Sequence, residues 1–184
     1  MSIDQHTKGL PGLRGAEHLG FTVPNLEEAS RFLVDVLGLE PYYERGPFES
    51  NDTWMQDALN VHPRAVMRKL RFFRCGNGTN FEVFEYESPD QRREEPKNSD
   101  VGGHHIGLYV TDIHKAVEHL RAHGVRVLGE PRQVASDAPN AGIWWVYFLA
   151  PWGMHFELVS FPEGSKPYER DMTRKLWNPC QPAL

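Results

Sequence analysis

The chain has 184 residues, of which 40% are hydrophobic and 24% are charged, and these proportions indicate a globular protein rather than a disordered chain. The net charge of −5 excludes the large positive field that binds a phosphate backbone, and the longest apolar run, residues 143–150, is too short to cross a bilayer. With two cysteines and a polar N-terminus that lacks the pattern of a secretory signal, we expect a cytoplasmic protein with no disulfide framework and with neither nucleic acid nor membrane as a partner.

Helix caps and glycines divide the first part of the chain into predicted elements. An N-terminal arm covers residues 1–13. A helix is expected over 26–37, because Asn25 can accept hydrogen bonds from a first helical turn and Gly38 can end the helix. Strands are expected over 15–23, 39–45, 66–75 and 80–87, with a short helix over 51–60 in an insertion at 47–63.

The second part of the chain follows a polar linker over residues 89–101, which lacks hydrophobic periodicity. A helix is expected over 113–123, with Asp112 as its cap and Gly124 at its end. Strands are expected over 103–110, 125–129, 143–149 and 154–160, and a C-terminal tail over 163–184 with a terminal helix over 168–177.

An internal repeat relates the two parts. Residues 16–23 resemble residues 103–110, and the segment 78–84 resembles the segment 153–159. Each part therefore has the order strand, helix, strand, strand, strand. The sequence predicts an α+β fold made of two tandem βαβββ modules, which cover residues 14–88 and 102–162.

Superposing the repeats places a histidine on the first strand and a glutamate on the last strand of each module: His18 and Glu82, then His105 and Glu157. Two neutral imidazoles and two carboxylates suit a divalent metal and leave positions for water or substrate. A glutamate in an apolar strand is costly to bury alone, and a metal would compensate that cost. Taken singly, each histidine could simply hydrogen-bond in the core, but the equivalence of all four residues favours a metal site.

Several motifs carry a resemblance to a known family: paired His-(Leu/Ile)-Gly strands, helix starts Val-Pro-Asn-Leu and Val-Thr-Asp-Ile, Val-Leu-Gly-Leu at 36–39, and the run 147–157. In this order they resemble the vicinal oxygen chelate superfamily of glyoxalases, bleomycin-resistance proteins and extradiol dioxygenases, over residues 14–162. The resemblance implies a glyoxalase-like fold whose curved mixed sheets surround a metal cleft. It also implies a homodimer and one divalent metal ion (Ni, Co, Mn, Zn or Fe) at His18, Glu82, His105 and Glu157.

For function, the resemblance implies a metal-dependent enzyme that catalyses a proton-transfer isomerisation, an epimerisation or a lyase reaction. The substrate would be a small oxygenated molecule that reacts through a metal-bound enediolate. Glu157 and Glu82 are the candidate catalytic carboxylates, and the sequence leaves their order of roles open. Tyr147, His155 and Trp145 are candidates for the substrate pocket.

Two other functions stay open at this point. His18, His105 and Glu157 could bind Fe(II) in an extradiol ring-cleaving dioxygenase, and Tyr147 occupies the place of a tyrosine in the signature of that branch. The histidine that this signature carries some residues earlier is absent, and Glu82 is surplus to such a site. The other alternative is a small-molecule sequestering protein, of the resistance type, with a relic metal site.

Overall fold

The computed structural model describes residues 10–161 and residue 176. In the first half of the chain the elements are β1 (His18–Thr22), α1 (Leu26–Arg31), the π-helical turn η1 (Phe32–Val36), β2 (Glu40–Arg45), α2 (Trp54–Leu59), β3 (Val66–Arg74) and β4 (Asn80–Glu87). In the second half they are β5 (His105–Tyr109), α3 (Ile113–Ala122), β6 (Arg126–Val127), β7 (Arg132–Gln133), β8 (Trp144–Leu149) and β9 (His155–Ser160). The predicted α+β class with two mixed sheets is confirmed.

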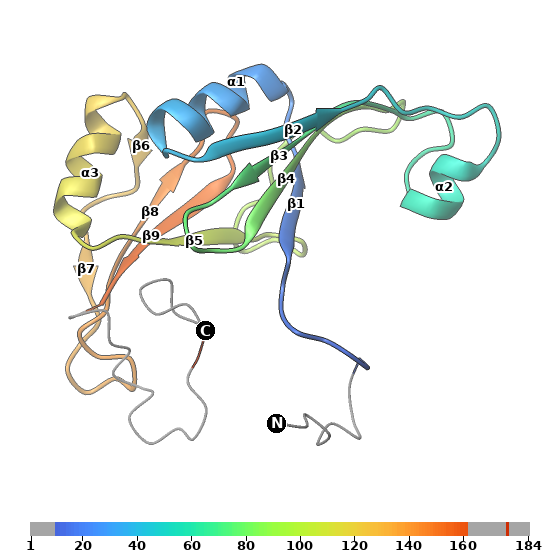
Figure 1. The fold of residues 1–184 in the computed structure, drawn as a ribbon. Coiled ribbons are helices and arrows are strands. Elements are labelled where there is room, and N and C mark those ends of the chain that lie inside the picture. The colour runs from blue at the N-terminus through green and yellow to red at the C-terminus, as the bar shows by residue number, and fades with distance from the viewer. Residues whose placement is uncertain (1–9, 162–175, 177–184) are drawn as a thin grey trace.

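Each half forms its own mixed sheet with the same strand arrangement. The order is β1-β4-β3-β2 in the first sheet and β5-β9-β8-β6 in the second, where the short β7 also pairs with β8. In both sheets the edge strand that comes first in the chain pairs in parallel with the last strand, and the other pairs are antiparallel. Figure 1 shows the two sheets next to each other, with α1 above their junction and with α2 and α3 at opposite ends of the molecule.

One hydrophobic core joins the halves. In β4 and β9 the residues that alternate with the candidate glutamates are buried, as strand parity predicts. Phe32 of η1 packs edge-on against Trp152 and Phe156 of the second half, with ring centroids 5.7 and 6.4 Å apart. In return, His119 of α3 lies 2.9 Å from the carbonyl oxygen of Val36. Contacts made by η1 and α3 thus join the two halves.

The first helix differs from the uniform α-helix that was expected over 26–37. Asn25 caps it as predicted, through a hydrogen bond from the amide of Glu28. From Phe32 onward the turn widens, and the amide of Leu37 donates to the carbonyl of Phe32, five residues earlier. This wider turn places both Phe32 and Leu33 in the core. Hydrophobic spacing does not distinguish such a turn from an α-helical one.

The predicted strands of the second half differ from the observed ones at two places. The short strand β7 was missed, because its two residues are exposed and carry no apolar alternation. The strand expected over 125–129 is shorter than predicted, at two residues. Residues 1–9 of the expected arm over 1–13 lie outside the described residues, and so does the tail over 163–184 with its expected helix, apart from residue 176. Among the helices that the structure does describe, none is long and apolar enough to cross a membrane.

Candidate functional site

The parallel pairing of β1 and β4 brings the first His–Glu pair together. Gly20 lies opposite Glu82 in the register, so His18, two residues earlier on the same face, sits diagonally beside the carboxylate. Nε2 of His18 is 3.3 Å from Oε2 of Glu82. Phe72 of β3, which pairs with Glu82, packs edge-on against the imidazole at 5.9 Å.

The second half repeats this geometry. Gly107 lies opposite Glu157, and Nε2 of His105 is 3.3 Å from Oε2 of Glu157. Tyr147 occupies the place that phenylalanine has in the first half, and it packs edge-on against His105 at 5.0 Å. Burial raises the pKa of Glu157, although the neighbouring imidazole partly opposes that shift. A carboxylate held in this way is neutralised readily, either by a proton or by a cation.

The structure brings each predicted histidine to its predicted glutamate, but it does not bring the four residues together. Across the described part of the chain, no group of three or more histidine, cysteine, aspartate or glutamate side chains is arranged to hold a metal ion. The predicted four-residue set is therefore present as two matched pairs, one on each sheet. Because β1 and β5 are edge strands, each pair lies next to the open edge of its sheet.

The donor atoms of each pair fit two adjacent positions around one ion. Imidazole nitrogen and carboxylate oxygen bind Zn²⁺ and similar ions at about 2.0–2.2 Å, so neighbouring donors on one ion are about 3.0–3.5 Å apart. The observed separation of 3.3 Å in both pairs falls in this range. The two pairs together would supply two nitrogens and two oxygens, a set that suits a divalent metal of borderline softness.

The candidate pocket residues lie on β8 and β9, in the sheet that carries the second pair. Trp145 packs edge-on against Tyr147 at 5.6 Å, so an aromatic row runs along β8 and reaches His105 through Tyr147. His155 lies opposite His105 in the register, and its Nδ1 is buried without a hydrogen-bond partner among the described residues. Burial and the charge of Glu157 raise the pKa of Tyr147, so its hydroxyl keeps its proton at neutral pH and can donate a hydrogen bond.

Sequence reasoning missed a cavity beside the first pair. This open cavity has a volume of about 670 Å³, and its lining includes His18, Glu82, Glu17, Tyr42, Tyr43, Phe72, Arg74 and Asn80. A β-bulge in β2, between Pro41 and Tyr43, inserts Tyr42 as an extra residue, and both tyrosines line the cavity. The bulge has no sequence pattern of its own. The repeat did indicate one of the lining residues, Asn80. It precedes Glu82 by the same two residues that separate the candidate pocket residue His155 from Glu157.

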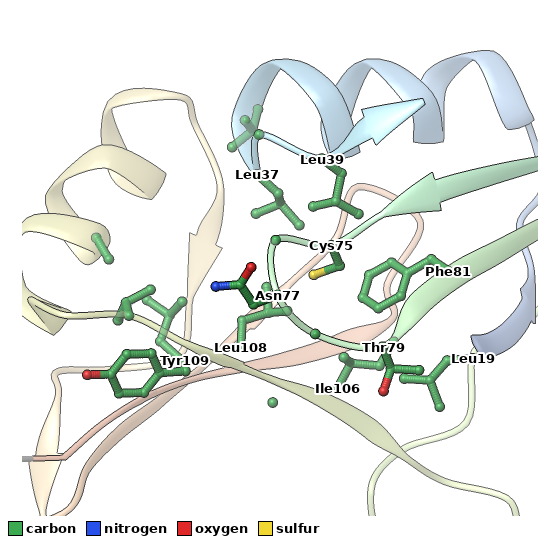
Figure 2. A pocket seen from close by; sticks show the side chains of 18 of the residues that line it. Leu19, Leu37, Leu39, Cys75, Asn77, Thr79, Phe81, Ile106, Leu108 and Tyr109 are labelled. Carbon is green, nitrogen blue, oxygen red and sulfur yellow. The ribbon is translucent and has the colours of Figure 1, made fainter. Parts of the chain in front are cut away.

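A second cavity of about 550 Å³ lies on the other side of the edge strands. Leu19 and Ile106 follow the two candidate histidines in the chain and line this cavity instead (Figure 2). Cys75 also borders it, and burial raises the pKa of the thiol, which therefore stays uncharged at neutral pH.

Comparisons with known proteins found relatives of this chain in sequence and in fold. A curated relative from Actinomyces sp., 2-epi-5-epi-valiolone epimerase, is 44% identical over 173 residues, which cover 94% of this chain and 92% of the relative. A glyoxalase family protein from Bacillus cereus superposes with a TM-score of 0.65 at 18% identity, covering 84% of this chain and 97% of that one.

A glyoxalase family protein from Enterococcus faecalis superposes with a TM-score of 0.55 at 19% identity, covering 79% of this chain and 97% of that one. At these identities the two structures support the fold alone. The family model described as Glyoxalase/Bleomycin resistance protein/Dioxygenase superfamily matches residues 17–143. Both this match, which spans most of the chain, and the 44% identical relative lead to the same assignment. The chain belongs to the glyoxalase/bleomycin resistance protein/dioxygenase superfamily.

Proposed function

We propose that this protein is a metal-dependent epimerase that acts on a small polyhydroxylated ketone. The observation that carries the proposal is the repeated His–Glu pair, with the same 3.3 Å separation in both halves. The name of the 44% identical relative, 2-epi-5-epi-valiolone epimerase, supports the reaction class and a substrate rich in oxygen atoms. An epimerase inverts one carbon centre, so the site must remove a proton from carbon and return it on the other face.

His18, Glu82, His105 and Glu157 are the residues that would hold the metal. When bound, a divalent cation supplies electrostatic stabilisation for the oxyanion that forms as the proton leaves carbon. The carboxylates are the candidates for the proton acceptor. Glu157, or its counterpart Glu82, would take up the proton as the general base. Tyr147 stands beside Glu157 as a neutral hydrogen-bond donor.

A second copy of the chain is the partner that we propose for completing the site. Each pair provides half of a four-donor set, and each lies at an open sheet edge, β1 or β5. Under a twofold axis, β1 of one copy can lie beside β5 of the other, and the same contact then occurs twice. Such a homodimer would hold two complete sites, each with one pair from each copy.

The reaction is tested with purified protein loaded with Mn²⁺, Co²⁺, Ni²⁺, Zn²⁺ or Fe²⁺ in separate samples. We expect at least one loaded form to epimerise 2-epi-5-epi-valiolone in deuterated water and to place deuterium at the inverted carbon. Removal of the metal by a chelator should abolish this exchange, and re-addition should restore it. Ring cleavage of catechols with oxygen uptake by the iron form, without epimerisation, would instead support a dioxygenase. Tight ligand binding without turnover in every form would support a sequestering protein.

The shared site is tested by mixing two inactive variants. One variant carries His18→Ala and Glu82→Gln, and the other carries His105→Ala and Glu157→Gln. In a random mixture half of the dimers are mixed, and each mixed dimer keeps one of its two sites intact, so activity should return to about a quarter of the wild-type value. If both pairs of one site come from the same chain, the mixture stays inactive. Each variant mixed with itself is the control.

A further inference from the structure

A neighbouring carboxylate contacts the ring nitrogen of His18 that does not face Glu82. Nδ1 of His18 lies 2.5 Å from Oε2 of Glu17, while its other nitrogen faces Glu82 at 3.3 Å. A carboxylate can only accept a hydrogen bond, so this contact requires the proton to be on Nδ1. In the neutral ring the other nitrogen, Nε2, then carries the free lone pair.

Asn80 holds Glu17 in this position. Its side-chain amide nitrogen donates to Oε1 of Glu17 at 3.2 Å and to the backbone carbonyl of Glu17 at 3.2 Å. Its backbone amide donates to the same carbonyl at 3.3 Å. The carboxylate is therefore fixed at both oxygens, with Oε2 on the histidine and Oε1 on the asparagine, although the side chain is largely exposed.

The second half lacks this arrangement. The residue in the place of Glu17 is His104, and its Nδ1 contacts the carbonyl oxygen of Gly102 at 3.0 Å. The residue in the place of Asn80 is His155. Within the described residues no carboxylate contacts Nδ1 of His105. The two ligand pairs share one geometry, but a carboxylate orients the imidazole in the first pair alone.

We infer that Glu17 is a positioning residue for His18, and that Asn80 in turn positions Glu17. The carboxylate selects the tautomer with the proton on Nδ1 and so presents Nε2 to a metal ion, as carboxylates commonly do for metal-binding histidines. The inference rests on the metal site proposed above. It assigns a different task to each half: the first supplies a pre-oriented nitrogen, and the second supplies a nitrogen without a carboxylate behind it.

Zn²⁺ affinity of the full chain, measured by competition with a chromogenic chelator, tests the inference. We expect Glu17→Ala to weaken binding by about 10–100-fold, the range seen when groups behind a metal ligand are removed. Glu17→Gln keeps a neutral acceptor and should fall between Ala and wild type, and Asn80→Ala should weaken binding less than Glu17→Ala. His104→Gln is the matched control in the second half, and it should leave the affinity at the wild-type value.

A second readout reports the tautomer directly. In metal-free protein labelled with ¹⁵N-histidine, above the pH range in which imidazole titrates, the His18 signals should show the proton on Nδ1 in the wild type. In Glu17→Ala they should move towards the Nε2-protonated form, while the His105 signals stay unchanged. His18→Ala assigns the signals by their loss.

The outcomes separate this inference from the proposed function. If the wild type binds no Zn²⁺ and none of the other metals, the metal site itself is wrong. If the wild type binds Zn²⁺ but Glu17→Ala binds it equally well, or if His18 carries its proton on Nε2 in the wild type, the positioning role is wrong and the metal site stands. A loss with Glu17→Ala as large as that with His18→Ala would make Glu17 a ligand and would also overturn the inference.

Discussion

The two halves of the chain hold the same pair of side chains in different surroundings. Strand register fixes the pair: in both sheets a glycine on the first strand lies opposite the glutamate, and the histidine precedes that glycine by two residues. The neighbours differ at equivalent positions, with Phe72 for Tyr147 and Asn80 for His155. The repeat therefore preserves the geometry of the donor atoms, while the side chains around them have diverged.

The divergence extends to the opposite face of the sheets. Arg71 pairs with Val83 in the first half, and Val146 pairs with Leu158 at the equivalent place in the second. Valine completes an apolar layer there, whereas the arginine forms ion pairs with Glu27 and Glu44. Comparing equivalent substitutions in the two halves shows which contacts the fold requires and which serve one half alone.

The largest expected effect tests whether the pairs are equal in function. His18→Ala and His105→Ala should each lower kcat/KM by roughly a thousandfold or more, because in the proposed metal site the loss of one ligand removes several kcal/mol of transition-state stabilisation. Metal content, measured by mass spectrometry, should fall in parallel. His123→Ala is the control, since that imidazole belongs to neither pair, contacts the carbonyl oxygen and the ring of His119, and should leave the rate unchanged. A large loss in one half alone would break the equivalence of the pairs.

The next largest effect concerns the hydrophobic core, in which Phe156 of the second half also packs on a residue of the first half. Phe156→Ala and Phe81→Ala each empty a fully buried site and should cost about 3–5 kcal/mol of unfolding free energy. We expect the larger cost for Phe156, because it packs on Phe148 and also on Phe32 of the first half. Urea denaturation followed by circular dichroism measures both. Leu128→Ala, at a position that is 39% exposed, is the control and should change stability by less than about 0.5 kcal/mol.

Patterns that repeat in the chain predicted most of the fold and of the pairs. Alternation, caps and glycines placed the longer strands and the helices, and the equivalence of His18 with His105 and of Glu82 with Glu157 identified the residues that the sheets bring together in pairs. Features that depend on contacts between distant segments were missed. The bulge at Tyr42 and the strand β7 arise from pairing with a neighbour, and they leave no periodic pattern in their own residues.

The sequence also did not predict that the four candidate residues would lie in two separate pairs. A repeat shows which residues are equivalent, but it does not show whether the two modules of one chain face each other or face another copy. The structure joins the halves through Phe32, which packs on the second half, and through His119, which contacts the carbonyl oxygen of Val36. Contacts of this kind combine residues far apart in the chain.

A smaller effect tests the charged layer of the first half, which Arg71 forms with Glu27 and Glu44 at the place where the second half has Val146. The Arg71 guanidinium donates to Ser30 at 2.6 Å and to Glu27 at 3.0 Å, and it also pairs with Glu44. Arg71→Ala removes these partners and leaves a buried hydroxyl with one hydrogen bond fewer, so it should cost about 1–3 kcal/mol in urea denaturation. Arg68→Ala, at an exposed ion pair on the same strand, should cost less than about 1 kcal/mol. Equal costs would mean that the layer adds nothing beyond surface pairing.

The smallest effect concerns the linker, which packs on the second half. The Glu95 side chain lies against Gly153 in the turn between β8 and β9, and burial raises the pKa of its carboxyl while His104 opposes the shift less strongly. A raised pKa means that the folded protein holds this proton more tightly than the unfolded chain does. The contribution of Glu95 to stability is therefore present in acid, and it is lost as pH rises through the raised value.

Glu95→Gln should consequently be more stable than the wild type at neutral pH, by less than about 1 kcal/mol, and should match it in acid, where the wild-type carboxyl is also uncharged. Thermal unfolding at both pH values measures the difference. Glu94→Gln, at the exposed side chain next to Glu95 in the chain, is the matched control. A stabilisation that persists unchanged in acid would mean that the amide acts through new contacts. The linker would then not place an uncompensated charge against the second half.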